Sequence, residues 1–134
     1  MQDEYSATTR NIRVRVRSIF LPDQSQPDER RYVWAYLIHI DNLGDETVQL
    51  LARTWRIIDG NGRVHHVHGE GVVGQQPILL PGGSHEYNSG TPLETPSGFM
   101  TGQYHMVVQA TGEAFNIEIP SFSLDSPYHA GVVH

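Results

Sequence analysis

The stretch HHVHGEGVVGQQP, from His65 to Pro77, combines two kinds of residue that do chemistry in proteins. Gly69, Gly71 and Gly74 spell G-x-G-x-x-G, a phosphate loop in dinucleotide-binding proteins when a strand precedes it and a helix follows it. Here the stretch leads into ILLPGG, whose proline and glycine pair, like the proline just before it, disfavour a helix. The sequence therefore predicts a bend between extended segments, with no dinucleotide site.

A weaker form of anion binding stays open. Consecutive backbone amides in a glycine-rich turn can hold a small anion, such as pyrophosphate or a dinucleoside polyphosphate, without any helix. The simpler interpretation is conformational: the glycines permit positive φ, and the two valines pack against the sheet. The candidate residues are Gly69, Glu70, Gly71, Val72, Val73 and Gly74 in the loop, with Arg53 and Arg63 as assisting cations.

The histidines suggest a divalent-metal site as a further alternative. His66 and His68 share one face of an expected strand, and with Glu70 they offer three ligands for zinc, nickel or cobalt. His85 or His105 are candidates for a fourth ligand. Surface histidines on an edge strand explain the same spacing.

Catalytic patterns are sparse. The only serine in a glycine-rich setting, Ser84, lacks the G-x-S-x-G pattern, and its neighbour His85 points to the opposite face of a strand. We therefore expect no catalytic residue, no enzymatic activity and no cofactor.

Composition narrows the class of protein. The 134 residues fit one domain, and the absence of cysteine excludes disulfides, thiolate metal sites and a cysteine nucleophile. A net charge of −6 argues against a nucleic-acid binder. The N-terminus lacks a signal peptide, and the apolar run VWAYLI is too short to span a bilayer. We expect a cytoplasmic protein without membrane insertion.

Short segments of alternating polarity, separated by turn residues, predict an all-β fold. We expect an antiparallel β-sandwich of about seven strands, fibronectin III-like or immunoglobulin-like, over 12–124, with a flexible N-terminus (1–11) and a flexible C-terminal tail (125–134). One expected strand, 47–59, places Leu51, Arg53, Trp55 and Ile57 on one face. The aromatic residues expected to fill the core are Trp34, Tyr36, Trp55 and Tyr104.

In the segment NIRVRVRSIF, Arg13, Arg15 and Arg17 alternate with apolar residues and form a stripe on the outer face of a strand. Such a stripe offers complementary charge to an acidic protein partner. The alternative is an ordinary solvated sheet face.

Four longer runs together resemble the ApaG family over roughly 12–124: LLARTWRIIDGNG, HGEGVVGQQPILLPGGSHEYNSG, GFMTGQYHM and FNIEIPSFSL. The resemblance implies a fibronectin III-like sandwich in a small, stand-alone cytoplasmic bacterial protein. It also implies a link to cobalt resistance and magnesium efflux, without catalytic residues to carry over. In eukaryotes the same domain is attached to larger proteins, which implies an interaction module. We expect a non-enzymatic binding domain with a protein partner, or else a small anion or a metal as ligand.

Overall fold

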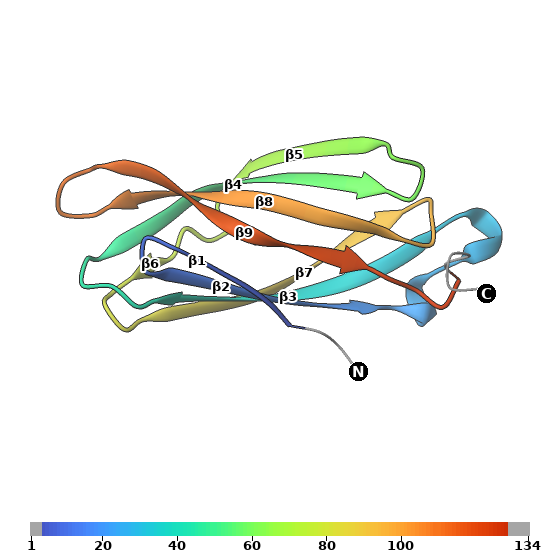
Figure 1. The fold of residues 1–134 in the computed structure, drawn as a ribbon, viewed down its shortest axis with the longest axis horizontal. Helices are drawn as coiled ribbons and strands as arrows, with labels where there is room; N and C mark the ends of the chain where they lie inside the picture. The colour runs from blue at the N-terminus through green and yellow to red at the C-terminus, as the bar shows by residue number, and fades with distance from the viewer. Residues whose placement is uncertain (1–3, 129–134) are drawn as a thin grey trace.

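The computed structural model describes residues 4–128, which form two antiparallel sheets packed face to face (Figure 1). This arrangement confirms the predicted β-sandwich. Two 3₁₀ turns, η1 (Pro22–Gln24) and η2 (Pro27–Glu29), lie between the second and third strands. No helix within the described residues is long and apolar enough to cross a membrane. The strands are β1 (Tyr5–Thr9), β2 (Ile12–Phe20), β3 (Tyr32–Asn42), β4 (Val48–Asp59), β5 (Val64–Glu70), β6 (Ile78–Leu79), β7 (Ser84–Leu93), β8 (Gly98–Val108) and β9 (Ala114–Leu124).

The two sides of the sandwich differ. One sheet has the strand order β1-β2-β3-β7, and the other has the order β5-β4-β8-β9, with the short β6 paired to the start of β4. On one side β9 contacts β1 and β2, which closes the sandwich. On the other side β5 ends one sheet and β7 ends the other, and this side carries the site described below.

The predicted aromatic core is confirmed, since Trp34, Tyr36, Trp55 and Tyr104 are all buried. The rings of Tyr36 and Trp55 approach across the two sheets with centroids 5.6 Å apart and planes inclined by 66°. Phe122 packs against both of them. The Tyr36–Trp55 and Trp55–Phe122 contacts are edge-to-face, a favourable arrangement for aromatic pairs, and the Tyr36–Phe122 contact is tilted. Together they join the sheets without a disulfide.

The predicted face of β4 is wrong at one position. Leu50 is fully buried, whereas Leu51 is only partly so, because the pairing of β4 with β8 shifts between Leu50 and Ala52. Such a bulge adds one residue and changes which face the following residues occupy. Before the bulge Leu50 points inward, and beyond it Trp55 and Ile57 point inward. Leu51 therefore does not belong to the buried face of β4.

The ends of the domain also differ from expectation. Part of the N-terminus expected to be flexible, Tyr5–Thr9, forms strand β1 and pairs with β2. After Leu124, the carbonyl oxygen of Asp125 accepts a hydrogen bond of 2.8 Å from the indole nitrogen of Trp34, and Ser126 is buried. The expected C-terminal tail therefore begins with residues that are tied to the core, and its remainder, 129–134, lies outside the described residues.

Candidate functional site

The glycine-rich stretch forms the end of β5 and a tight turn, and no helix follows it. The amide of Val72 donates to the carbonyl oxygen of Gln75 at 2.7 Å, and the amide of Gln75 donates back at 3.0 Å. Between them, Val73 and Gly74 have φ values of 47° and 79°. This left-handed pair is what a two-residue type I′ turn requires. The segment is thus a bend between extended segments.

The two valines of the turn behave differently. Val72 is 1 % exposed and belongs to the core cluster, whereas Val73 is 62 % exposed. The expectation that both pack against the sheet is right for Val72 and wrong for Val73. A β-branched residue at positive φ is strained, and such strain is held in place only by the surrounding structure.

Three amides of the loop are engaged in the protein's own hydrogen bonds. The amide of Gly71 donates to Leu51, and those of Val72 and Gln75 donate across the turn. Gly69 lies within β5 and pairs with Arg53, and only the other two motif glycines have positive φ. These three amides are therefore not available to a phosphate, which weakens the case for an anion site in the loop.

Arg53 lies against this loop from the neighbouring strand β4. Its Nη1 donates to the carbonyl oxygens of Glu70 (3.2 Å) and Gly71 (2.9 Å). A Cβ atom on Gly69 would lie 2.7 Å from the same nitrogen, so position 69 must lack a side chain for the guanidinium to occupy this place. The structure brings Arg53 to the glycines and leaves Arg63 at the other end of β5.

The histidines of residues 4–128 do not assemble into a metal site. No group of three or more histidine, cysteine, aspartate or glutamate side chains in residues 4–128 could hold a metal ion. The trio His66, His68 and Glu70 is therefore not a ligand set in this structure, although alternation puts all three on one face of β5. His85 lies in the other sheet, where partial burial lowers the pKa of its imidazole.

His68 and His105 instead share a hydroxyl on the outer face of the sheet. Thr54 Oγ1 lies 2.9 Å from Nδ1 of His68 and 2.7 Å from Nε2 of His105. The other nitrogen of His105 lies 2.8 Å from Oδ1 of Asn116. The cluster joins three adjacent strands of the sheet, β5, β4 and β8, to β9.

The arginine stripe lies on one face of β2 as predicted from the alternation, but each arginine has a carboxylate partner. Arg13 and Arg15 both pair with Asp41 on β3, at 3.0 and 3.1 Å, and Arg17 pairs with Glu4 at 3.4 Å. The carboxylate of Asp41 is only 13 % exposed and pairs with both guanidinium groups. The positive charge expected for an acidic partner is largely neutralised within the protein.

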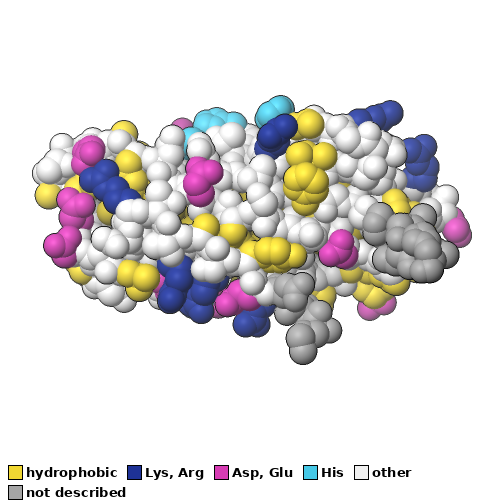
Figure 2. Space-filling model, viewed as in Figure 1, with side chains coloured by type: hydrophobic (Ala, Val, Ile, Leu, Met, Phe, Trp, Pro, Cys, Tyr) yellow, Lys and Arg dark blue, Asp and Glu magenta, His cyan; other side chains and the backbone are white. Residues whose placement is uncertain are grey.

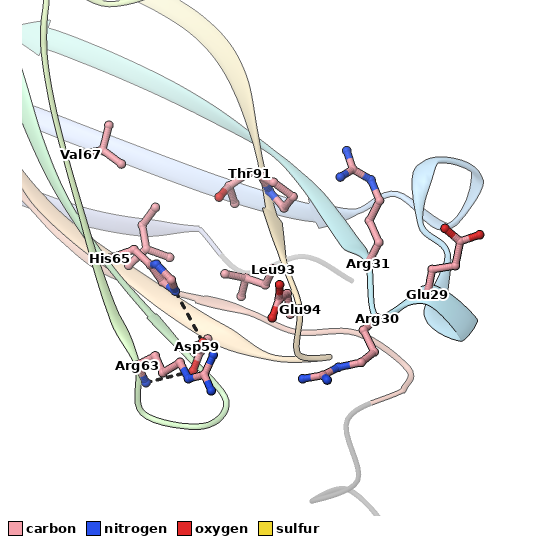
Figure 3. A pocket seen from close by; sticks show the side chains of 12 residues that line it. Glu29, Arg30, Arg31, Asp59, Arg63, His65, Val67, Thr91, Leu93 and Glu94 are labelled. Carbon is pink, nitrogen blue, oxygen red and sulfur yellow. Dashed lines mark hydrogen bonds and ion pairs between the residues drawn. The ribbon is translucent and has the colours of Figure 1, made fainter.

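A groove runs between the two sheets on their open side, along β5 and β7. It consists of an outer cavity of about 650 Å³ (Figure 3) and an inner cavity of about 400 Å³. The two cavities share four lining residues, so we treat them as one cross-sheet groove. The shared residues are Ile57, Val67, Thr91 and Pro92.

The outer end of the groove is built on the turn between β4 and β5. Asp59 begins this DGNG turn, and its Oδ1 accepts hydrogen bonds from the amides of Asn61 (2.9 Å) and Arg63 (3.0 Å). His65 Nε2 lies 3.5 Å from its Oδ2 (Figure 3). Burial alone would raise the pKa of Asp59, but the hydrogen bonds from Arg63, Asn61 and His65 outweigh burial and lower it.

Arginines without a carboxylate partner collect at this groove. Of the nine arginines, Arg10 and the β2 stripe make ion pairs, and within residues 4–128 the other five make none. Four of these five line the groove: Arg30, Arg31 and Arg63 at its outer end and Arg53 at its inner end. The fifth, Arg56, lines a shallow hollow with His66 outside the groove.

The groove also has acidic residues. Asp59 is engaged with its own turn, whereas Glu29 and Glu94 line the outer cavity without an ion pair among the described residues. In Figure 3 Glu29 points away from the other lining side chains. On the face drawn in Figure 2, acidic and basic side chains are interspersed, which differs from the continuous basic surface of a nucleic-acid binder.

Sequence reasoning missed much of this groove. Arg30, Arg31 and Thr91 were not singled out, since only the sheet arrangement brings them to Arg63 and Val67. No local sequence signal marks Arg30, whose unusual φ of 56° after η2 is visible only in the structure.

Comparison with known proteins agrees with this architecture. The model of the ApaG domain matches residues 22–108. The chain is 61 % identical to Protein ApaG of Rhodospirillum centenum, over 92 % of this chain and 95 % of that protein. It is 59 % identical to Protein ApaG of Mesorhizobium japonicum, over 92 % and 94 % of the two chains.

A solved structure gives the same result in three dimensions. The ApaA protein from Bordetella pertussis superimposes with a TM-score of 0.84 at 43 % identity, covering 91 % of this chain and 98 % of that chain. The C-terminal domain of wzt, with a TM-score of 0.55 and 9 % identity, shares the fold alone. With this domain match and these relatives, the chain belongs to the ApaG family.

Proposed function

We propose that this chain is a non-catalytic recognition domain that binds an extended segment of a partner protein, in the cytoplasm, through the cross-sheet groove. The observation that carries the proposal is that the groove is bounded by the terminal strands of both sheets, β5 and β7. The free edge of a terminal strand carries backbone groups that can pair with an added strand, while the groove receives that strand's side chains.

Strand β5 is the edge best suited to this role. It pairs only with β4 among the described residues, and nearly all of its seven residues are exposed. Protective devices that natural proteins place on edge strands, such as lysine or proline, are absent from VHHVHGE. Val67 faces the groove and lines both cavities, so it offers an apolar contact to an incoming side chain.

A non-catalytic role is supported by the state of the reactive groups. Thr54, His105 and Asn116 form a hydroxyl–imidazole–amide chain, but they lie on the outer face of strands whose amides are paired within the sheet. Stabilising an oxyanion requires free, convergent donors near the nucleophile. Any effect on cobalt or magnesium would, in this proposal, arise through the partner protein, since no three-ligand site is present in residues 4–128.

A matched pair of variants on β5 tests the proposal. Val67 and Val64 are 40 % and 41 % exposed, but only Val67 lines the groove. Peptides selected from a random displayed library on the native domain should lose binding to Val67→Trp and keep binding to Val64→Trp. Equal binding to both variants, with both folded by circular dichroism, would exclude the groove as the recognition surface.

A small polyphosphate is a second candidate ligand. The clustering at the groove of arginines without a carboxylate partner in residues 4–128 favours a polyphosphate, because one guanidinium group can donate to two phosphate oxygens at once. Titration with inorganic pyrophosphate, followed by amide NMR, distinguishes two possible binding places. Shifts centred on Arg30, Arg31 and Arg63 would indicate binding in the groove, whereas shifts confined to Gly71–Gly74 would indicate binding at the loop. The absence of shifts at millimolar pyrophosphate would remove the candidate.

A further inference from the structure

The inner cavity of the groove, which we name the Arg53 pocket, is walled by side chains that donate hydrogen bonds and by apolar groups. It holds about 400 Å³, and no aspartate or glutamate of residues 4–128 lines it. The described residues therefore supply no negative charge to this space. The donors are Arg53, Trp55, Tyr36, Tyr87, Ser89 and Thr91, and the apolar lining is Ile57, Val67, Val73, Pro92 and Met100.

Arg53 is the one cation that the described residues place in this pocket, and it is incompletely satisfied. Its Nη1 donates to two loop carbonyls, whereas Nε and Nη2 donate to no acceptor within residues 4–128. No carboxylate of those residues lies within ion-pair distance of it. A guanidinium has five N–H donors in a planar fork that matches the two oxygens of one carboxylate.

Two tyrosines add further donors. The hydroxyls of Tyr87 and Tyr104 lie 2.5 Å apart, so the pair uses one hydroxyl proton for this bond and retains a second. Burial raises the pKa of Tyr36, Tyr87 and Tyr104, which keeps all three protonated at neutral pH. Tyr36 and Tyr87 line the pocket, and Ser89 is a hydrogen-bond partner of Tyr36.

Trp55 carries a donor without a hydrogen-bond partner. Its indole Nε1 is buried and has no hydrogen-bond partner in the part of the chain that the structure describes. Buried indole nitrogens normally find an acceptor, because an unpaired donor costs free energy. The same residue lines the Arg53 pocket, whose other polar groups are also donors.

We propose that the Arg53 pocket binds one carboxylate group of the partner segment, carried by a glutamate or aspartate side chain. This inference rests on the function proposed above and names the chemistry that the groove selects. A single guanidinium matches a single negative charge, and the apolar wall suits the methylene groups of an acidic side chain. A phosphate dianion would be left with one uncompensated charge in the same surroundings.

The outer end of the groove favours further acidic residues in the bound partner segment. Arg30, Arg31 and Arg63 line the outer cavity beyond the four shared residues, where Glu94 offsets part of their charge. A segment lying along β5 with one acidic residue in the Arg53 pocket would meet this second, more exposed set of arginines about 10–20 Å further on, since a strand rises about 3.3 Å per residue.

Two peptides that differ in one group test the assignment. The probes are the acetylated, amidated peptides Thr-Val-Thr-Glu-Thr-Val-Thr and its glutamine counterpart, titrated into the full chain and followed by amide NMR. The native domain should bind the glutamate peptide about tenfold more tightly, because charge-assisted hydrogen bonds are stronger than neutral ones. Arg53→Gln should abolish this preference. Arg56→Gln should preserve it, since Arg56 also has no carboxylate partner among residues 4–128 but lies outside the groove.

A second variant covers the case in which Arg53→Gln disturbs the glycine loop. Tyr87→Phe keeps the ring, lies on β7 outside the loop and should lower the glutamate preference about threefold or more. Equal affinity for the two peptides, with Val67→Trp weakening both, would overturn the carboxylate pocket and leave groove binding intact. Binding of neither peptide, with pyrophosphate shifting Arg53 and Tyr87, would overturn it in favour of a phosphate ligand.

Discussion

The hydroxyl groups of Tyr87 and Tyr104 meet at 2.5 Å across the interior of the sandwich. Tyr87 belongs to β7 at the end of one sheet, and Tyr104 belongs to β8 in the centre of the other. Both side chains are buried, so this polar contact bridges the sheets in surroundings that exclude water. Of the two residues, Tyr87 also lines the Arg53 pocket.

The two hydroxyls should contribute to the free energy of unfolding as a coupled pair. Tyr87→Phe and Tyr104→Phe should each lower the free energy of unfolding by about 1–2 kcal/mol, because each leaves the other hydroxyl buried without its partner. The double variant should cost clearly less than the sum of the two single costs. Urea unfolding of the four proteins gives the coupling directly, and strictly additive costs would mean that the two hydroxyls do not depend on each other.

Much of the fold could be predicted from local patterns, whereas the site could not. Alternation in 12–20 and 32–42 and the aromatic positions Trp34 and Trp55 identified the strands and the core correctly. These features depend on residues close together in sequence. The bulge after Leu50 depends instead on the pairing partner of β4, and YSATT forms a strand only because β2 offers it an edge.

The groove depends on contacts between distant parts of the chain. Arg30 and Arg63 line one cavity because two different sheets end side by side there. Whether an arginine is free or neutralised depends on the strand register that sets Asp41 opposite Arg13. The sequence shows where the arginines are but not which of them form ion pairs. The strand register pairs the arginines of β2 and leaves those at the groove without a carboxylate partner among the described residues.

The glycines of the G-x-G-x-x-G motif should differ sharply in their tolerance of alanine. A Cβ atom on Gly71 would lie 2.4 Å from the carbonyl oxygen of Gln75, in addition to the strain of its φ of +64°. Gly74 has φ of +79° but open space around the added atom. We expect Gly71→Ala to cost about 3 kcal/mol or more and Gly74→Ala about 1–2 kcal/mol.

Thermal unfolding measures these two costs, and Gly62→Ala is a suitable control because Gly62 also has a positive φ, of +83°, with open space. A Gly74→Ala cost that matches the Gly71→Ala cost would contradict the turn geometry. The expected order of the two costs follows from the packing inside the turn and does not depend on any ligand.

Reversing the charge of Arg15 should destabilise the fold. Arg15 and Arg13 together hold the mostly buried carboxylate of Asp41, so Arg15→Glu would place a second carboxylate beside it. We expect a loss of about 1–3 kcal/mol in the free energy of unfolding, and Arg17→Glu should cost about 1 kcal/mol or less because the Arg17–Glu4 pair is exposed. Denaturant titration of both variants decides the matter, and similar small costs for the two would show that the stripe is an ordinary solvated surface.

Asp59 should make the stability of the outer end of the groove depend on acid pH. Its folded-state pKa is lowered, so the carboxylate contributes stability that is fully present above the unfolded-state pKa of about 4 and is lost as the pH falls through the lower folded-state value. Asp59→Asn retains an oxygen that can accept from the amides of Asn61 and Arg63 but lacks the charge. The native chain should therefore be the more stable of the two at pH 5–7, and the difference should shrink between pH 4 and pH 2. A difference that stays constant down to pH 2 would assign the role of Asp59 to turn geometry alone, with no contribution from its charge.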